Sequence, residues 1–196
     1  MPGQDVLSVN SGPGVLYWDE IDGGEAVFPA DPTVVPAAGW NAGPYMEDGW
    51  LFEVAQTLVD INVDEEPDPV AVEKTGQLIT MTGSMAQSEL ELFRLAMGGG
   101  TIANTPGPPD FDTYTPPGSV DAPIEWEVLF RADASPKGTD LKLDIQLPRV
   151  ISAATINLNF KKSTSSSDKR QIGVQFRALV PSAGDIFSIL NTNSLT

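Results

Sequence analysis

The sequence DINVDEEPDPVAVEKTG, residues 60–76, decides the fold, because it joins two stretches in which apolar and polar residues alternate. Alternation with a period of two is typical of β-strands. Pro67 and Pro69 in its middle cannot donate the hydrogen bonds of a β-ladder, so the two stretches must separate there. We therefore predict a long hairpin over about residues 50–86, whose connecting loop covers residues 64–72.

The first predicted strand of this hairpin, residues 50–63, places its apolar side chains differently at its two ends. Val59 and Ile61 share one parity and predict a half-buried strand, whereas Phe52 and Val54 have the other parity. The apolar face must therefore switch along this strand, either through a β-bulge or through different burial at the two ends.

The acidic residues between the two strands match part of a calcium-binding loop. Asp60, Asn62 and Asp64 match the first three ligand positions of an EF-hand. The match then fails, because Glu65 stands where the loop needs glycine and Ala71 where it needs a bidentate glutamate. A hairpin tip in solvent is the favoured interpretation, and a weak divalent-cation site is the alternative.

The stretch SELELFRLAM, residues 88–97, has the signals of a helix. Ser88 and Glu91 have the spacing of a capping box, and the glycine run that begins at Gly98 predicts a clean stop. An apolar stripe is formed by Leu92, Leu95 and Ala96. We expect this helix to pack on one face of a sheet.

Regular alternation returns near residue 124 and predicts four successive strands. They cover residues 124–132, 141–147, 155–160 and 171–180. Turn-rich connections between such strands are typical of an antiparallel meander with one face in water. Two Pro- and Gly-rich segments, residues 22–48 and 101–123, show no comparable pattern and are expected to be long loops.

The composition limits the chemistry that the chain can perform. Its 196 residues suffice for a single domain with its own core, and they include neither cysteine nor histidine. Disulfides are therefore excluded, and the commonest general base and transition-metal ligand are missing. We predict no catalytic residue, no metal site and no cofactor. No stretch approaches the roughly 20 apolar residues of a membrane span, and the start does not read as a secretion signal.

The net charge of −16 is concentrated in one part of the chain. Residues 1–110 hold 18 of the 27 acidic residues and only two of the 11 basic ones, Lys74 and Arg94. This balance argues against a protein that holds nucleic acid, because affinity for phosphates depends on Lys and Arg. It is compatible with nucleic acid that passes nearby without adhering.

Glu125 and Glu127 are the paired carboxylates that could act in catalysis. Two residues apart on a strand, they would share a face about 7 Å apart, near the separation found in inverting glycosidases. Arg131 lies on the same strand face, and no ring of aromatic residues converges on the pair. A solvated strand face is the favoured interpretation.

The order of these segments resembles the major tail protein, or tail-tube protein, of long-tailed, non-contractile bacteriophages. The resemblance covers most of the chain and is strongest from about residue 12 to residue 100. Its most specific pieces are DINVDEEPDP at 60–69 and the strand that runs directly into SELELFRLAMG at 88–98.

The resemblance implies an antiparallel β-sandwich or small barrel with one flanking helix and a protruding hairpin, all in a single domain of residues 1–196. In that family, subunits form rings, usually of six, that stack into a hollow tube, and a long hairpin loop reaches the adjoining ring. The residues that correspond to this loop are Asp60, Asn62, Asp64, Glu65, Glu66, Pro67, Asp68, Pro69 and Glu73. The N-terminal arm 1–11 and the C-terminal tail 191–196 are further candidates for contacts between rings.

The resemblance also implies the partners and the location. We expect the chain to contact other copies of itself, tail-tip and tail-terminator proteins, and a tape-measure protein inside the tube. Double-stranded DNA would pass without specific binding, and no membrane contact is expected. The protein would be assembled in the host cytoplasm and end in the virion.

Two other classes of function stay open from the sequence. A carbohydrate-binding or carbohydrate-cleaving β-sandwich would use Trp40, Trp50 or Trp126 as stacking platforms and Glu125 and Glu127 as acids. An adhesive surface domain would need a secretion signal, which we do not expect here.

Overall fold

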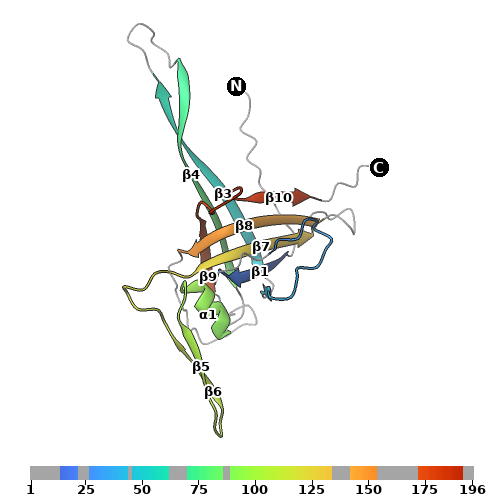
Figure 1. The fold of residues 1–196 in the computed structure, drawn as a ribbon, viewed down its shortest axis with the longest axis vertical. Coiled ribbons are helices and arrows are strands. Elements are labelled where there is room, and N and C mark those ends of the chain that lie inside the picture. Colours follow the sequence, from blue (N-terminus) through green and yellow to red (C-terminus); the bar gives the residue numbers. More distant parts are fainter. Residues whose placement is uncertain are drawn as a thin grey trace, which may run out of the picture.

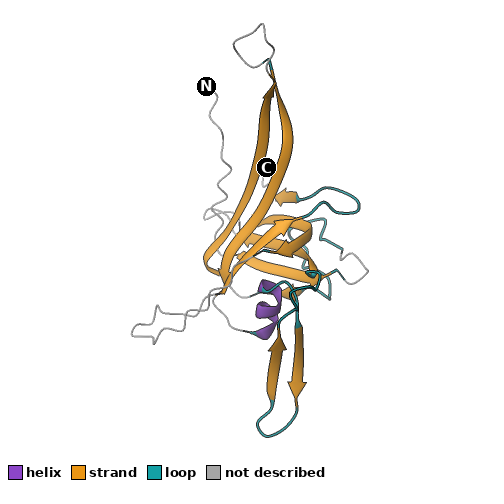
Figure 2. Ribbon diagram, turned by 90° about the vertical axis from the view of Figure 1, so that its left-hand side faces the viewer, coloured by secondary structure: helices purple, strands orange, loops and turns teal. Residues whose placement is uncertain are grey.

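A computed structural model of the chain describes residues 14–21, 27–43, 46–61, 70–85, 89–133, 142–153 and 172–191. The strands are β1 (Gly14–Glu20), β2 (Asn41–Ala42), β3 (Met46–Ile61), β4 (Ala71–Met85), β5 (Thr101–Thr105), β6 (Phe111–Thr115), β7 (Glu125–Asp133), β8 (Lys142–Ser152), β9 (Ile172–Ala178) and β10 (Ser188–Asn191). The helix is α1 (Leu90–Ala96). The described part is thus mainly antiparallel β with one helix, as predicted (Figures 1 and 2).

Eight strands form one sheet in the order β2-β1-β7-β8-β9-β4-β3, and β10 pairs with β8 beside this path. The sheet folds over itself around a shared core. The ring of Trp50 on β3 lies 6.3 Å from that of Phe130 on β7 and 5.9 Å from that of Phe176 on β9. The two end strands of the described sheet, β2 and β3, do not pair with each other, so the sheet is open and not a closed barrel.

The helix covers one side of this core. Leu92, Leu95 and Ala96 are buried, which confirms the predicted apolar stripe. The Ser152 hydroxyl of β8 donates a hydrogen bond of 2.6 Å to the Ala96 carbonyl. The end of the helix is thereby fixed to the sheet.

The β3–β4 hairpin confirms the hairpin expected over residues 50–86. Its register shifts between Thr57 and Leu58, where Thr75 of β4 is the extra residue of a bulge. The apolar side chains do change face along β3, but the half-buried strand expected at Val59 and Ile61 is wrong. These side chains are 48% and 43% exposed because this end of the hairpin extends past the strands that could cover it.

The expectation of a loop over all of residues 101–123 is also wrong. β5 and β6 form a second hairpin, paired from Thr101 and Thr115 to Thr105 and Phe111. Threonine, isoleucine, phenylalanine and tyrosine favour extended backbone, and they supply most of these strand positions. The prolines are confined to the turn and to the segment after β6, where they interrupt no ladder hydrogen bond.

β7 and β8 are covered on both faces, so the expected meander with one wet face is wrong for these two strands. Glu127, Asp144 and Gln146 on their outer face are all buried. The cover is the described part of the Pro- and Gly-rich segment, residues 27–43, which also contains the short strand β2. Gln146 Nε2 donates a hydrogen bond of 2.8 Å to the Pro29 carbonyl. The strand expected at 155–160 lies outside the described residues.

Candidate assembly surfaces

The β3–β4 hairpin projects from the body of the molecule (Figures 1 and 2). β9 pairs with β4 only over Thr80–Met85, so residues 54–61 and 70–78 lie beyond its support. We call these two segments the arm. A two-stranded ribbon without further contacts is marginally stable in water, so a partner is expected for this surface.

The arm carries much of the exposed apolar surface of the described residues. Of 16 large hydrophobic side chains that are exposed, seven lie on the arm: Val54, Leu58, Val59, Ile61, Val70, Val72 and Leu78. Contiguous apolar surface is rare on proteins that stay monomeric, and where it occurs it commonly marks a contact with another molecule.

The pairing of β3 with β4 distributes these side chains over both faces of the arm. One face presents Val59, Ile61 and Leu78, and the other presents Val54, Leu58 and Val72. Since neither set lies against the body, both faces of the arm are available for contact.

Both edges of the arm are open as well. β3 is the last strand of the described sheet, and its outer edge is unpaired. The outer edge of β4 is unpaired through Ile79, and its pairing with β9 begins at Thr80. Unpaired N–H and C=O groups along a strand edge are a template for the addition of another strand.

The structure places two of the nine residues predicted for the loop, and it does not bring them together. Asp60 and Glu73 are exposed on opposite faces of the arm. Asn62, Asp64, Glu65, Glu66, Pro67, Asp68 and Pro69 lie outside the described residues, as do the N-terminal arm and residues 192–196 of the tail. Within the ranges that the structure covers, no group of three or more carboxylates could hold a metal ion.

The start of the helix differs from the prediction, whereas its end agrees. Glu89 is the N-cap, and its side chain makes no capping hydrogen bond. Ser88 lies outside the described residues, and Glu91 forms an ion pair of 3.9 Å with Arg94. Gly98 ends the helix with φ of +71°, a conformation that glycine adopts without strain.

The β5–β6 hairpin, which the sequence patterns did not reveal, projects from the end of the molecule opposite the arm (Figures 1 and 2). One of its faces is entirely uncharged and exposed. This face consists of Thr101, Ala103, Thr105, Phe111, Thr113 and Thr115, and we call it the threonine face. On the other face, the Tyr114 hydroxyl at the base donates a hydrogen bond of 2.8 Å to the Gly99 carbonyl, whereas Asn104 and Asp112 farther out are exposed.

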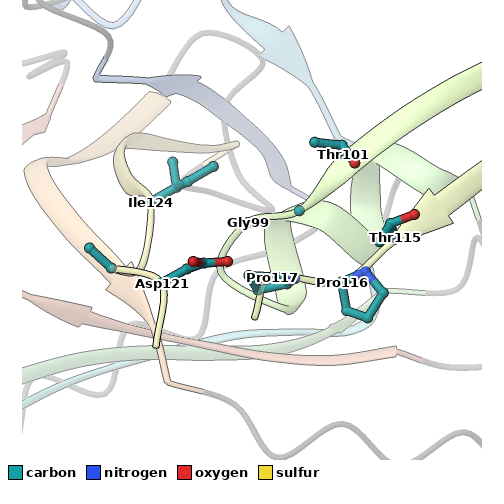
Figure 3. A pocket seen from close by; sticks show the side chains of 9 residues that line it. Gly99, Thr101, Thr115, Pro116, Pro117, Asp121 and Ile124 are labelled. Carbon is teal, nitrogen blue, oxygen red and sulfur yellow. The ribbon is translucent and has the colours of Figure 1, made fainter. Parts of the chain in front are cut away.

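A shallow depression of about 370 Å³ adjoins the base of this hairpin (Figure 3). It is bordered by Thr101 and Thr115 and lined by Pro116, Pro117 and Ile124. Asp121 also reaches it, and its carboxylate accepts a hydrogen bond of 2.6 Å from the Gly118 N–H. The depression therefore extends the threonine face toward the body with mainly apolar walls.

Glu125 and Glu127 do not form a pair of catalytic acids. Both Glu125 oxygens accept hydrogen bonds of 2.7 Å from Arg149, and this guanidinium lowers the pKa of the carboxyl. Glu127 is only 2% exposed, so the prediction of a solvated strand face is wrong for it. The register between β7 and β8 shifts here, with Trp126 opposite Val150 and Val128 opposite Leu147, so the extra residue lies on β8, whereas β7 pairs with β1 without a shift.

The tryptophans proposed as sugar platforms are placed differently from one another. Trp50 and Trp126 are buried in the core, at 7% and 2% exposure. Trp40 is half-buried, and its ring meets that of Phe28 edge-on at 5.1 Å. Two of the three platforms are therefore inaccessible.

Comparisons with known proteins do not identify the chain. No protein family model matches it, and no curated protein shows significant similarity. None of the helical structure in the described ranges is long and apolar enough to cross a bilayer.

Proposed function

We propose that this chain is the structural subunit of a phage tail tube, in which rings of copies, six to a ring, stack into a hollow acidic conduit for DNA. The observation that carries the proposal is the arm. It exposes apolar side chains on both faces and leaves both edges open. Burial against further copies accounts for a surface of this kind in a chain with no catalytic constellation among its described residues.

The ends of the sheet support assembly by strand addition. The path of the sheet ends in β2 on one side and β3 on the other, so the two terminal edges differ. Contacts between unlike surfaces form rings when the rotation closes and open filaments when it does not. Contacts of both kinds would be needed in a stack of rings.

The charge of the chain fits a conduit better than a binding site for nucleic acid. At −16 per copy, free subunits repel one another and stay dispersed. A wall that carries part of this charge would also repel the phosphates of a duplex, so DNA could slide along it without adhering.

The test is the assembly of the purified protein, followed by negative-stain microscopy and analytical ultracentrifugation. We expect rings or tubes from the wild type. The double variant Leu58→Ser/Val59→Ser, with one change on each face of the arm, should remain as free subunits with an unchanged free energy of unfolding.

A matched control is Val35→Ser/Val180→Ser, which removes two side chains that are 79% and 69% exposed away from the arm. This control should assemble as the wild type does. Wild-type protein that stays a monodisperse globule at every concentration and salt tested would overturn the proposal.

A further inference from the structure

The proposed assembly assigns contacts to the arm and to the edges of the sheet, but none to the β5–β6 hairpin. We propose that its threonine face, together with the depression at its base, receives the arm of a second copy of this chain and so forms the contact between successive copies along the tube. This rests on the proposed function and names the surface that the arm would meet.

The first argument is geometric. The arm and the β5–β6 hairpin lie at opposite ends of the long axis of the molecule (Figures 1 and 2). When copies are aligned in one direction, the arm of each points to the hairpin of the next. Such a contact joins two different surfaces, so it leaves a free arm at one end of any stack and a free hairpin at the other.

The second argument is electrostatic. The arm carries Asp60 and Glu73 against the single base Lys74. An arm that met a second arm would bring these acids together, at a cost in repulsion. The threonine face carries no charge, so an arm that lies there opposes a like charge only at Asp121, which borders the depression beside that face.

The third argument is chemical. On the arm, Val59, Ile61 and Leu78 lie on one face, which also carries Glu73 opposite Val59. On the hairpin, β-branched threonines and a Phe111 that is 56% exposed offer a surface of matching character, which continues into the proline-lined depression. Exposed aromatic residues of this kind are common anchors of protein interfaces.

The hairpin is also held in place before any partner arrives. Besides the Tyr114 hydrogen bond, Arg94 Nε donates one of 3.2 Å to the Gly100 carbonyl at the base. Across the ribbon, Asn104 Nδ2 donates a hydrogen bond of 2.7 Å to Asp112. A preformed surface loses little conformational entropy when it binds.

Cysteine cross-linking tests the contact directly, because the natural chain has no cysteine. The variant Val59→Cys/Thr113→Cys, oxidised with copper phenanthroline at assembling concentration, should give a ladder of disulfide-linked multimers on a non-reducing gel. Equal amounts of the two single variants, mixed, should give dimers that contain one chain of each. Val59→Cys/Val35→Cys is the matched control, because Val35 is also exposed but lies away from the β5–β6 hairpin and its depression, and it should give at most a trace of ladder.

Three outcomes would overturn the inference. Val59→Cys alone could link to itself as efficiently as to Thr113→Cys, the control could form an equal ladder, or the double variant could form none although tubes are seen. A second pair, Ile61→Cys with Ala103→Cys, repeats the test at exposed positions of the same two faces. Absence of any assembly by the wild type would instead refute the proposed function, and the inference with it.

Discussion

The Arg131 guanidinium on β7 donates two hydrogen bonds to the Asp144 carboxylate on β8, from Nε to Oδ1 at 2.7 Å and from Nη2 to Oδ2 at 2.6 Å. Asp144 is fully buried, and Arg131 donates a third hydrogen bond of 2.7 Å from Nη1 to the Val34 carbonyl. The pair therefore fixes the covering segment 27–43 to the outer face of the sheet.

We expect Asp144→Ala to lower the free energy of unfolding by about 3–5 kcal/mol, because it leaves a largely buried guanidinium without its counter-charge. Urea denaturation of the purified variant measures the loss. Glu125→Ala is the matched control, because Arg149 also donates two hydrogen bonds to the Glu125 carboxylate. In that pair, both side chains are about a third exposed. That variant should lose about 0–1 kcal/mol. Equal losses would show that burial does not decide the strength of the two pairs.

The Glu125–Arg149 pair should make stability depend on pH in a defined direction. Arg149 lowers the pKa of Glu125 below its ordinary value of 4.5, so the folded protein favours the ionised carboxyl more than the unfolded chain does. The contribution is present above about pH 4.5 and is lost as the pH falls through the lowered pKa. The wild type should therefore be more stable than Glu125→Gln near neutral pH, and the two should converge in acid. A difference that grew in acid would contradict this sign.

Two glycines of the same hairpin should respond differently to substitution. Gly100 has φ of +104°, and a Cβ there would lie 2.5 Å from the Thr115 carbonyl oxygen. We expect Gly100→Ala to cost about 1–3 kcal/mol from the backbone conformation alone, and more from the clash. Gly107 in the turn has open space around it, so Gly107→Ala should change little. Chemical denaturation of both variants, read against the wild type, decides the point.

The sequence predicts those elements best where a strand or helix pattern reports burial against the rest of the chain. The alternating apolar residues around Val128 and Phe130 indicated a buried strand, and the stripe of Leu92 and Leu95 indicated a helix on a sheet. In both cases, the residues that form the core are spaced along the chain with the period of the strand or helix to which they belong.

The failures have two physical causes. Val59 and Ile61 alternate with polar residues as in a buried strand, but their side chains are exposed. Alternation does not show whether other residues of the same chain pack against the apolar side chains. Asp144 and Gln146 look solvated in the sequence, yet they are buried beneath a distant, irregular segment that is held by Arg131 and Gln146. The β5–β6 hairpin escaped detection because five-residue strands rich in threonine, between prolines, carry little hydrophobic signal.

Assembly should be promoted by salt. Screening shortens the range of electrostatic repulsion from about 10 Å at 0.1 M to about 3 Å at 1 M, whereas burial of apolar side chains such as Val59 is not screened. For a chain of net charge −16, the fraction of protein in sedimenting polymers should therefore rise with ionic strength. Leu58→Ser/Val59→Ser should stay unassembled across the series. Polymers that dissolve as salt is added would indicate contacts held by ion pairs instead.

Shortening the connection between β3 and β4 should separate folding from assembly. Residues Glu65–Asp68 follow an arm whose described side chains lie outside the core, so their deletion removes no core contact that the structure describes. We expect the deletion variant to unfold at the same urea concentration as the wild type. It should nevertheless form fewer and shorter tubes by electron microscopy, because the resemblance assigns this loop to the contact between rings. A deletion of Gly107–Pro109 in the β5–β6 turn is the companion variant, since it shortens the opposite projection. If the Glu65–Asp68 deletion instead unfolds the protein, the segment contributes to the core and its assignment to the tip is wrong.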